Sequence, residues 1–191
     1  MTIWKEMLAI FSRYDDSEEQ RDELRRLVAM MPPDVTSVAD AEREEAQDVG
    51  AKTLYYLGEL DRMLDWATPP LTPAVKRWIG FALFDLQRYD EALPYFTRAL
   101  KELDFQAWAR TKVNELVLCC RIHVEPGTLN LEDFAALHAE YESLAEDAPV
   151  PVELHRALAY AEESGALPGT LITQAREVFM DTFREWGLDK K

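Results

Sequence analysis

The spacing of apolar residues along this chain constrains its fold more than any other feature. Apolar side chains recur at intervals of three and four, as in Ile3, Met7 and Ile10, and not at the two-residue interval of strands. Only seven glycines occur, and the hairpin-turn pairs Asn-Gly and Asp-Gly are both missing. The pattern predicts an all-α fold of about ten helices joined by short links.

Local signals predict where several of these helices begin and end. Ser17 followed by Gln20 is typical of a capping box, and Thr72 before Pro73 is a favourable helix start. Thr36 or Ser37 is expected to cap a long third helix that ends at about Tyr56, and the last helix is expected over about residues 170–186. The tetrapeptide Pro-Gly-Thr-Leu occurs at residues 126–129 and again at 168–171, each time before an apolar periodic stretch.

Residues 78–100, WIGFALFDLQRYDEALPYFTRAL, predict two short helices with a tight break between Gln87 and Asp90. Gly80 and Ala92 are small enough to let paired helices approach, and Phe96 is large enough to fill the space between hairpins. This stretch resembles the tetratricopeptide repeat, whose pattern is W-x2-L-G-x2-Y…A-x3-F…P. One clear repeat covers about residues 73–106, and fainter ones on either side extend the resemblance over residues 44–146.

The resemblance implies a right-handed superhelix of antiparallel helical hairpins that forms one domain over residues 1–191. Its expected parts are an N-terminal hairpin over residues 1–35, repeats over residues 36–146 and a capping hairpin over residues 147–191. In such a fold the first helices of successive hairpins line a concave groove, which binds a peptide or a protein segment.

The charge of the chain argues against two classes of partner. The formal net charge is −15, and an acidic surface repels both nucleic acid and anionic lipid, so we expect neither a nucleic-acid nor a membrane partner. The charge is unevenly distributed along the chain. Residues 1–68 contain 8 Lys and Arg against 16 Asp and Glu, residues 69–130 contain 8 against 7, and residues 131–191 contain 5 against 13.

No motif in the sequence indicates catalysis. His123, His138 and His155 lack the spacing that places two imidazoles on one metal ion, and the glycine patterns of phosphate-binding loops do not occur. Cys119 and Cys120 lie in an apolar helix and predict buried, inert thiols. We therefore expect a non-catalytic protein with no cofactor and no metal. Without a disulfide framework or a recognisable signal peptide, a cytoplasmic location is the simplest expectation.

The candidate binding residues lie in the near-neutral middle of the chain. Phe81 and Phe84 fall outside the apolar stripe of their predicted helix and are expected, with neighbouring cations, to face the groove. The predicted protein-binding set is Arg77, Phe81, Phe84, Trp108 and Lys112.

Two functions follow as hypotheses. The first is a protein–protein interaction scaffold, an adaptor or chaperone that binds a peptide or protein segment in its groove. The alternative is an acidic inhibitor or immunity-type protein that neutralises a basic toxin or enzyme, because complementary charge speeds encounter. Association of two copies of the chain stays open.

Overall fold

A computed structural model of the chain describes residues 2–13, 16–144 and 148–188. Within these residues the chain forms eleven α-helices and two short 3-10 helices, and no strand. The predicted all-α fold of about ten helices is therefore confirmed. The chain divides into two compact units, residues 1–87 and residues 88–191, which are described one at a time.

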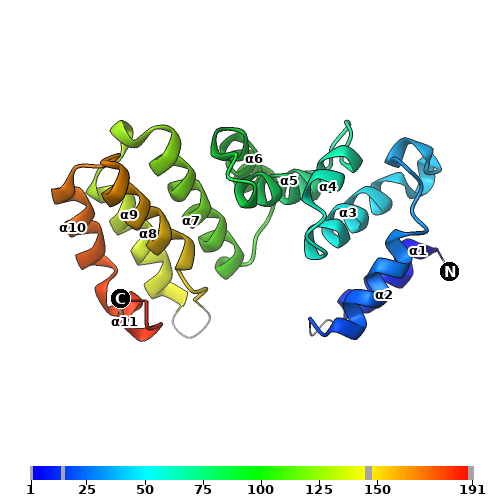
Figure 1. Ribbon diagram of the computed structural model, residues 1–191, viewed down its shortest axis with the longest axis horizontal. Coiled ribbons are helices and arrows are strands. Elements are labelled where there is room, and N and C mark those ends of the chain that lie inside the picture. The colour runs from blue at the N-terminus through cyan, green and yellow to red at the C-terminus, as the bar shows by residue number, and fades with distance from the viewer. Residues whose placement is uncertain (1, 14–15, 145–147, 189–191) are drawn as a thin grey trace. The chain divides into compact units, whose positions relative to one another are not determined.

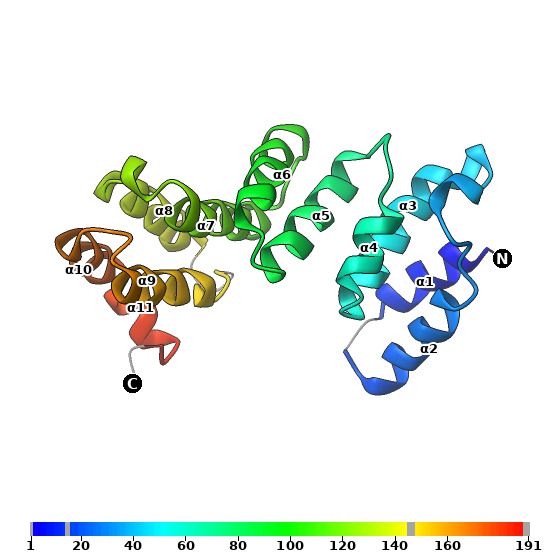
Figure 2. The same ribbon diagram turned by 45° about the horizontal axis from the view of Figure 1, so that its top comes forward.

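The first unit contains five α-helices and one 3-10 helix (Figure 1). They are α1 (Ile3–Phe11), α2 (Glu18–Val28), η1 (Val35–Ser37), α3 (Asp40–Tyr56), α4 (Leu60–Trp66) and α5 (Pro73–Asp85). Helix α3 packs against α1, α2, α4 and α5, so it occupies the centre of this unit (Figure 2). The buried core includes Met7, Leu24, Leu54, Met63 and Val75.

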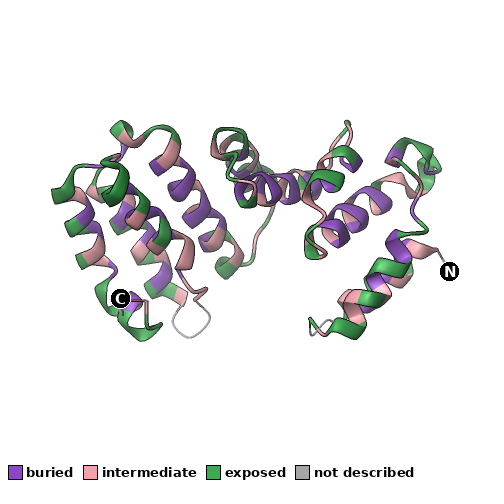
Figure 3. Cartoon of the chain, in the orientation of Figure 1, coloured by how far each residue is buried: buried purple, intermediate pink, exposed green. Residues whose placement is uncertain are grey.

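The second unit contains six α-helices and one 3-10 helix. They are α6 (Tyr89–Glu102), α7 (Ala107–Val124), η2 (Pro126–Thr128), α8 (Leu131–Leu144), α9 (Val152–Ser164), α10 (Gly169–Val178) and α11 (Met180–Glu185). Helix α7 packs against α6, α8 and α9, and α10 packs against α8 and α9. Buried residues therefore line much of α7 (Figure 3). The largest enclosed side chains are those of Phe96, Phe134 and Phe179.

Within each unit the helices follow one another as hairpins. Consecutive helices pack together in the pairs α1–α2, α3–α4, α7–α8 and α9–α10, and the first helix of one pair packs against the first helix of the next, as α1 does on α3 and α7 on α9. The sequence predicted this serial pairing. The clearest repeat, residues 73–106, includes α5 of the first unit and α6 of the second.

Two predicted helix starts are confirmed in atomic detail. The Ser17 hydroxyl accepts a hydrogen bond from the Gln20 backbone N–H, at 3.4 Å, at the start of α2. The Thr72 hydroxyl accepts one from the Val75 N–H, at 3.2 Å, and Pro73 is the first residue of α5. Both side chains satisfy backbone donors that the first turn of a helix leaves unpaired.

Two predicted boundaries are wrong. Neither Thr36 nor Ser37 caps the third α-helix, because the Asp34 carboxylate accepts from the Ser37 N–H at 3.1 Å and closes the 3-10 turn η1 there. The α-helix α3 then starts at Asp40. The last predicted helix is also not continuous, since it divides at Phe179 into α10 and α11.

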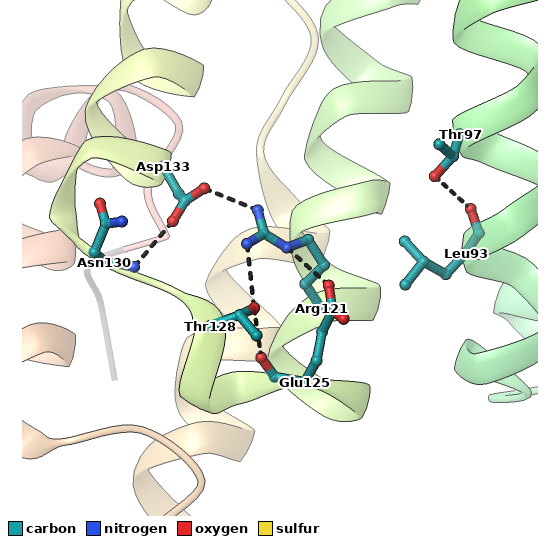
Figure 4. Close-up of polar contacts among 7 residues, drawn as sticks. All are labelled: Leu93, Thr97, Arg121, Glu125, Thr128, Asn130 and Asp133. Atoms are coloured by element: carbon teal, nitrogen blue, oxygen red, sulfur yellow. Dashed lines mark hydrogen bonds and ion pairs between the residues drawn. The ribbon is translucent and has the colours of Figure 1, made fainter.

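Arg121 holds the loop between α7 and α8 in place (Figure 4). Its guanidinium donates to the carboxylates of Glu125, at 3.1 Å, and Asp133, at 2.8 Å, and to the Thr128 hydroxyl, at 3.2 Å. Asp133 also accepts from the Asn130 N–H at 2.9 Å. One cation therefore joins the end of α7, the turn η2 and the first turn of α8.

Candidate functional site

The first unit carries a surface rich in aromatic rings, which we call the aromatic face. Because α1, α3 and α5 pack in series, the last turn of α1, the second half of α3 and the middle of α5 come together. The aromatic face consists of Phe11, Lys52, Tyr55, Tyr56, Arg77, Trp78 and Phe81.

The rings of the aromatic face form a continuous network. Tyr55 lies 5.4 Å from Trp78 and 5.8 Å from Phe81, measured between ring centroids, and Trp78 and Phe81 are 5.7 Å apart. Tyr56 extends the network to Phe11, at 5.3 Å. Tilted and edge-on pairs at these separations are the favourable arrangements of aromatic rings, so the network holds α1, α3 and α5 in register.

Two cations lie against these rings. The Lys52 ammonium nitrogen is 4.0 Å from the centroid of Phe11, and the guanidinium carbon of Arg77 is 4.8 Å from the centroid of Trp78. Both separations are typical of cation–π contacts. Both side chains are half-buried. Burial lowers the pKa of Lys52 and of Arg77 below their ordinary values, and the nearby carboxylate of Asp48 opposes this effect.

Asp48 places a carboxylate close to Lys52 and Arg77. Burial raises the pKa of its carboxyl group, and the charge of Arg77, a hydrogen bond from Trp78 and the charge of Lys52 partly oppose that shift. Its Oδ1 atom is enclosed and has no hydrogen-bond partner among the residues that the structure describes. Three ionisable groups with shifted pKa values thus lie together beside half-exposed rings, and such groupings are enriched at functional sites.

Much of the aromatic face is accessible. Tyr56 is 37% exposed, and Phe11, Tyr55 and Phe81 are half-buried, whereas Trp78 is buried beneath them. Half-buried rings beside desolvated cations offer a protein segment both apolar contact and hydrogen-bond donors for its carbonyl or carboxylate groups.

The predicted site residues are distributed over both units. Arg77 and Phe81 belong to the aromatic face, whereas Phe84 is buried, with 9% of its surface exposed. In the second unit, Trp108 is 50% exposed at the start of α7, and its ring N–H donates to the Gln106 side chain at 2.8 Å. Lys112 forms an ion pair with the buried carboxylate of Glu115 at 2.7 Å.

Sequence reasoning missed the part of the face that α1 and α3 contribute. Phe11, Tyr55 and Tyr56 lie in segments far from α5 along the chain, and no local pattern links them to Phe81. One available signal was the pair of adjacent tyrosines, Tyr55 and Tyr56, at the end of the predicted third helix. Because adjacent residues on a helix point in different directions, at least one of the two has to leave the core.

The histidines and cysteines occupy structural surroundings in the second unit. His123 is stacked between Tyr89, at 3.9 Å, and Tyr160, at 4.0 Å, while His138 and His155 lie edge-on to Phe179 and Phe183. Cys119 and Cys120 are buried, and burial raises the pKa of both thiols, for Cys120 to about 12. Over the described part of the chain, no group of three or more His, Cys, Asp or Glu side chains is arranged to bind a metal ion.

Comparison with known proteins gives no match: no family model, no curated protein and no solved structure matches this chain. Among the helices of the described residues, none has both the length and the apolar character that crossing a bilayer requires.

Proposed function

We propose that this protein is a non-catalytic interaction scaffold, similar to tetratricopeptide repeat adaptors and chaperones, and that it binds a peptide or protein segment on the aromatic face. The observation that carries this proposal is the set of half-exposed rings on α1, α3 and α5, with Lys52 and Arg77 held against them. Aromatic and arginine side chains dominate the binding energy of protein interfaces, which favours this face over the mixed polar surface around it.

A double variant on the aromatic face tests the proposal. Tyr56→Ala with Phe81→Ala removes two accessible rings and leaves the buried Trp78 in place. Wild-type and variant proteins are immobilised and used to capture proteins from the native host, and the captured proteins are identified by mass spectrometry. We expect the variant to fail to capture at least one partner that the wild type captures. That partner should bind purified wild-type protein at least ~10-fold more tightly than it binds the variant, because loss of an interface anchor typically has an effect of this size.

Two controls make this experiment specific. Met30→Ala removes an apolar side chain of the same unit that is 59% exposed and lies outside the aromatic face, so its captured set should match that of the wild type. Trp108→Ala asks whether the exposed ring of the second unit contributes to binding. If every partner survives the Tyr56→Ala, Phe81→Ala substitutions in a variant of unchanged helical content, the binding surface lies elsewhere.

The second candidate function is an acidic inhibitor or immunity-type protein for a basic toxin or enzyme. The net charge of −15 favours it, with the excess of carboxylates concentrated in residues 1–68 and 131–191. Salt separates the two functions. Between about 50 mM and about 500 mM NaCl the Debye length falls from above 10 Å to a few Å. Binding of a basic partner to the acidic ends should weaken steeply over that range, and binding of an apolar segment to the aromatic face should change little.

A further inference from the structure

The second unit contains a cavity of about 610 Å³ between α8 and the α10–α11 segment. We call it the α8–α11 cavity. Its α8 wall consists of His138, Tyr141 and Glu142, and its α11 wall of Asp181, Thr182, Glu185 and Trp186; Val178 and Ala148 complete the lining. None of these residues belongs to the aromatic face, so this inference does not depend on the function proposed above.

The geometry of α11 explains why acidic and aromatic side chains occur together on its side of the cavity. Residues 181, 182, 185 and 186 are spaced at one, four and five positions, so they share one side of the helix. That side carries two carboxylates and an indole ring and borders the cavity, with the Asp181 side chain largely exposed at its rim. The opposite side carries Phe183, which is buried in the core of the unit.

Trp186 is 44% exposed and follows directly after α11. The helix α11 ends at Glu185, Trp186 is its C-cap residue, and Gly187 follows at φ +67°, a conformation that favours glycine; the Leu188 N–H bonds to the Phe183 carbonyl at 2.8 Å. This closing turn fixes the backbone at the position of the indole. The indole lies at the edge of the cavity.

The charges around the cavity are unbalanced. Glu142, Asp181 and Glu185 are part of its lining, whereas no Lys or Arg of the described residues is. Asp181 pairs with Arg184, which lies outside the lining, at 3.0 Å, and Glu142 lies 3.8 Å from the His138 ring. Glu185 has no ion pair among the residues that the structure describes. Among its described lining residues, the cavity therefore combines an accessible indole ring with exposed carboxylates at its rim, contributed by both α8 and α11.

We propose that the α8–α11 cavity binds an arginine side chain of a partner protein. A guanidinium group is planar, so it stacks on the Trp186 ring while its N–H groups donate to carboxylates at the edge of the same plane. The carboxylates lie on both walls, which matches the fork of donors on arginine better than the single ammonium of lysine. A neutral side chain of the same shape would leave the negative charge of the cavity uncompensated.

Titration of the full-length protein with acetyl-arginine amide tests this proposal. Binding is followed by NMR through the indole N–H signal of Trp186, which Trp186→Phe identifies by its absence. The matched probe is acetyl-citrulline amide, which replaces the charged guanidinium by a neutral urea group of nearly the same size. We expect a saturable shift of the Trp186 signal. The protein should bind the arginine probe at least ~5-fold more tightly than the citrulline probe, and also more tightly than acetyl-lysine amide.

Variants locate the binding site. Glu185→Gln and Asp181→Asn should each weaken arginine binding by about 2- to 5-fold, in the range of single charged contacts at exposed sites. Glu163→Gln on α9 removes an exposed carboxylate that is not part of the lining, so it should leave the affinity unchanged. An equal response to arginine and citrulline, a Trp186 signal that does not move, or a loss with Glu163→Gln equal to that with Glu185→Gln would overturn the proposal. The last result would mean that the probe responds to overall charge only.

Discussion

Glu115 is a carboxylate fully enclosed within the second unit. One of its oxygens accepts from the Leu154 N–H at 2.9 Å, and the other accepts from the Lys112 ammonium at 2.7 Å and the Tyr141 hydroxyl at 2.8 Å. Leu154 belongs to the first turn of α9, where backbone N–H groups have no partner within the helix. This one residue of α7 therefore fixes α8 by a side chain and α9 by its backbone.

We predict that Glu115→Gln lowers the free energy of unfolding by about 3 kcal/mol, because it breaks a buried ion pair and turns an N–H group of the amide toward existing donors. Tyr141→Phe removes one donor only and should cost about 1–2 kcal/mol. Urea unfolding followed by circular dichroism measures both changes. Glu177→Gln, an exposed position on α10, is the control and should stay within about 0.5 kcal/mol of the wild type. A cost for Glu115→Gln as small as that of the control would contradict the role given to this carboxylate.

Asp133 gives a prediction that depends on pH. Burial raises the pKa of its carboxyl group, but the hydrogen bond from the Asn130 N–H and the charge and hydrogen bond of Arg121 outweigh it, so the pKa is lowered overall. A folded-state pKa below the unfolded value means that the ionised form stabilises the fold. This contribution is complete above the unfolded pKa of about 3.9 and disappears as the pH falls through the folded pKa.

Asp133→Asn should therefore lower the free energy of unfolding by about 1 kcal/mol at pH 7, as loss of a helix-capping carboxylate typically does. The difference between wild type and variant should persist down to about pH 5 and shrink below about pH 4. Urea unfolding at each pH measures it, with Asp104→Asn at an exposed position as the control. A difference that grows as the pH falls would have the opposite sign to this prediction.

At the scale of the helices, the packing of α3 on α4 depends on one missing side chain. A Cβ atom at Gly50 would lie 2.6 Å from the ring nitrogen of Trp66 and 3.1 Å from the methyl carbon of Met31. Trp66 cannot move aside easily, because it is buried and packs 5.9 Å from Trp4, measured between ring centroids. The absence of a Cβ at Gly50 thus allows the close approach of these two helices.

Gly50→Ala should lower the free energy of unfolding by about 1–3 kcal/mol, the usual cost of overpacking. The better helix propensity of alanine would act in the opposite direction by about 1 kcal/mol, so a destabilised variant shows that the steric cost exceeds it. Gly127→Ala is the matched control, since no atom lies within 4 Å of a Cβ there and its φ is not positive. Thermal and urea unfolding of both variants gives the comparison. A Gly50→Ala protein more stable than wild type would mean that Trp66 adjusts without cost.

The sequence predicts features that depend on neighbours along the chain. The caps at Ser17 and Thr72 involve residues three positions away and were predicted correctly. Features that depend on contacts between distant segments of the chain were not predicted. Phe84 looked exposed from the pattern of α5 alone but is buried, and the ring contacts from Phe11 through Tyr56 to Trp78 join three helices. The candidate site was therefore predicted only in the part that a single helix contributes, Arg77 and Phe81.

At the scale of the whole molecule, charge is the dominant feature. The chain carries 36 Asp and Glu against 21 Lys and Arg, and the first unit contains 17 of these acidic residues and 10 of the basic ones. Both units are thus acidic, with net charges of −7 and −8. Lys52 and Arg77 are two of the 10 basic residues of the first unit, and the carboxylate of Asp48 lies close to both.

The net charge of −15 leads to a last prediction, that moderate salt stabilises this protein. Two effects compete. Salt screens the repulsion among the surplus carboxylates, which stabilises the folded state. It also screens the ion pairs, many of which join exposed arginines to acids three positions away, as in Arg88–Glu91 and Arg184–Asp181. Such exposed pairs contribute only about 0–1 kcal/mol each, so the repulsion should dominate.

We expect the Tm to rise by several degrees between about 10 mM and about 500 mM NaCl, a change of roughly 1 kcal/mol or more in stability. Calorimetry measures it, and sucrose at matched osmolality controls for effects unrelated to charge. A Tm that falls with added NaCl would mean that the ion pairs contribute more than the surplus negative charge costs.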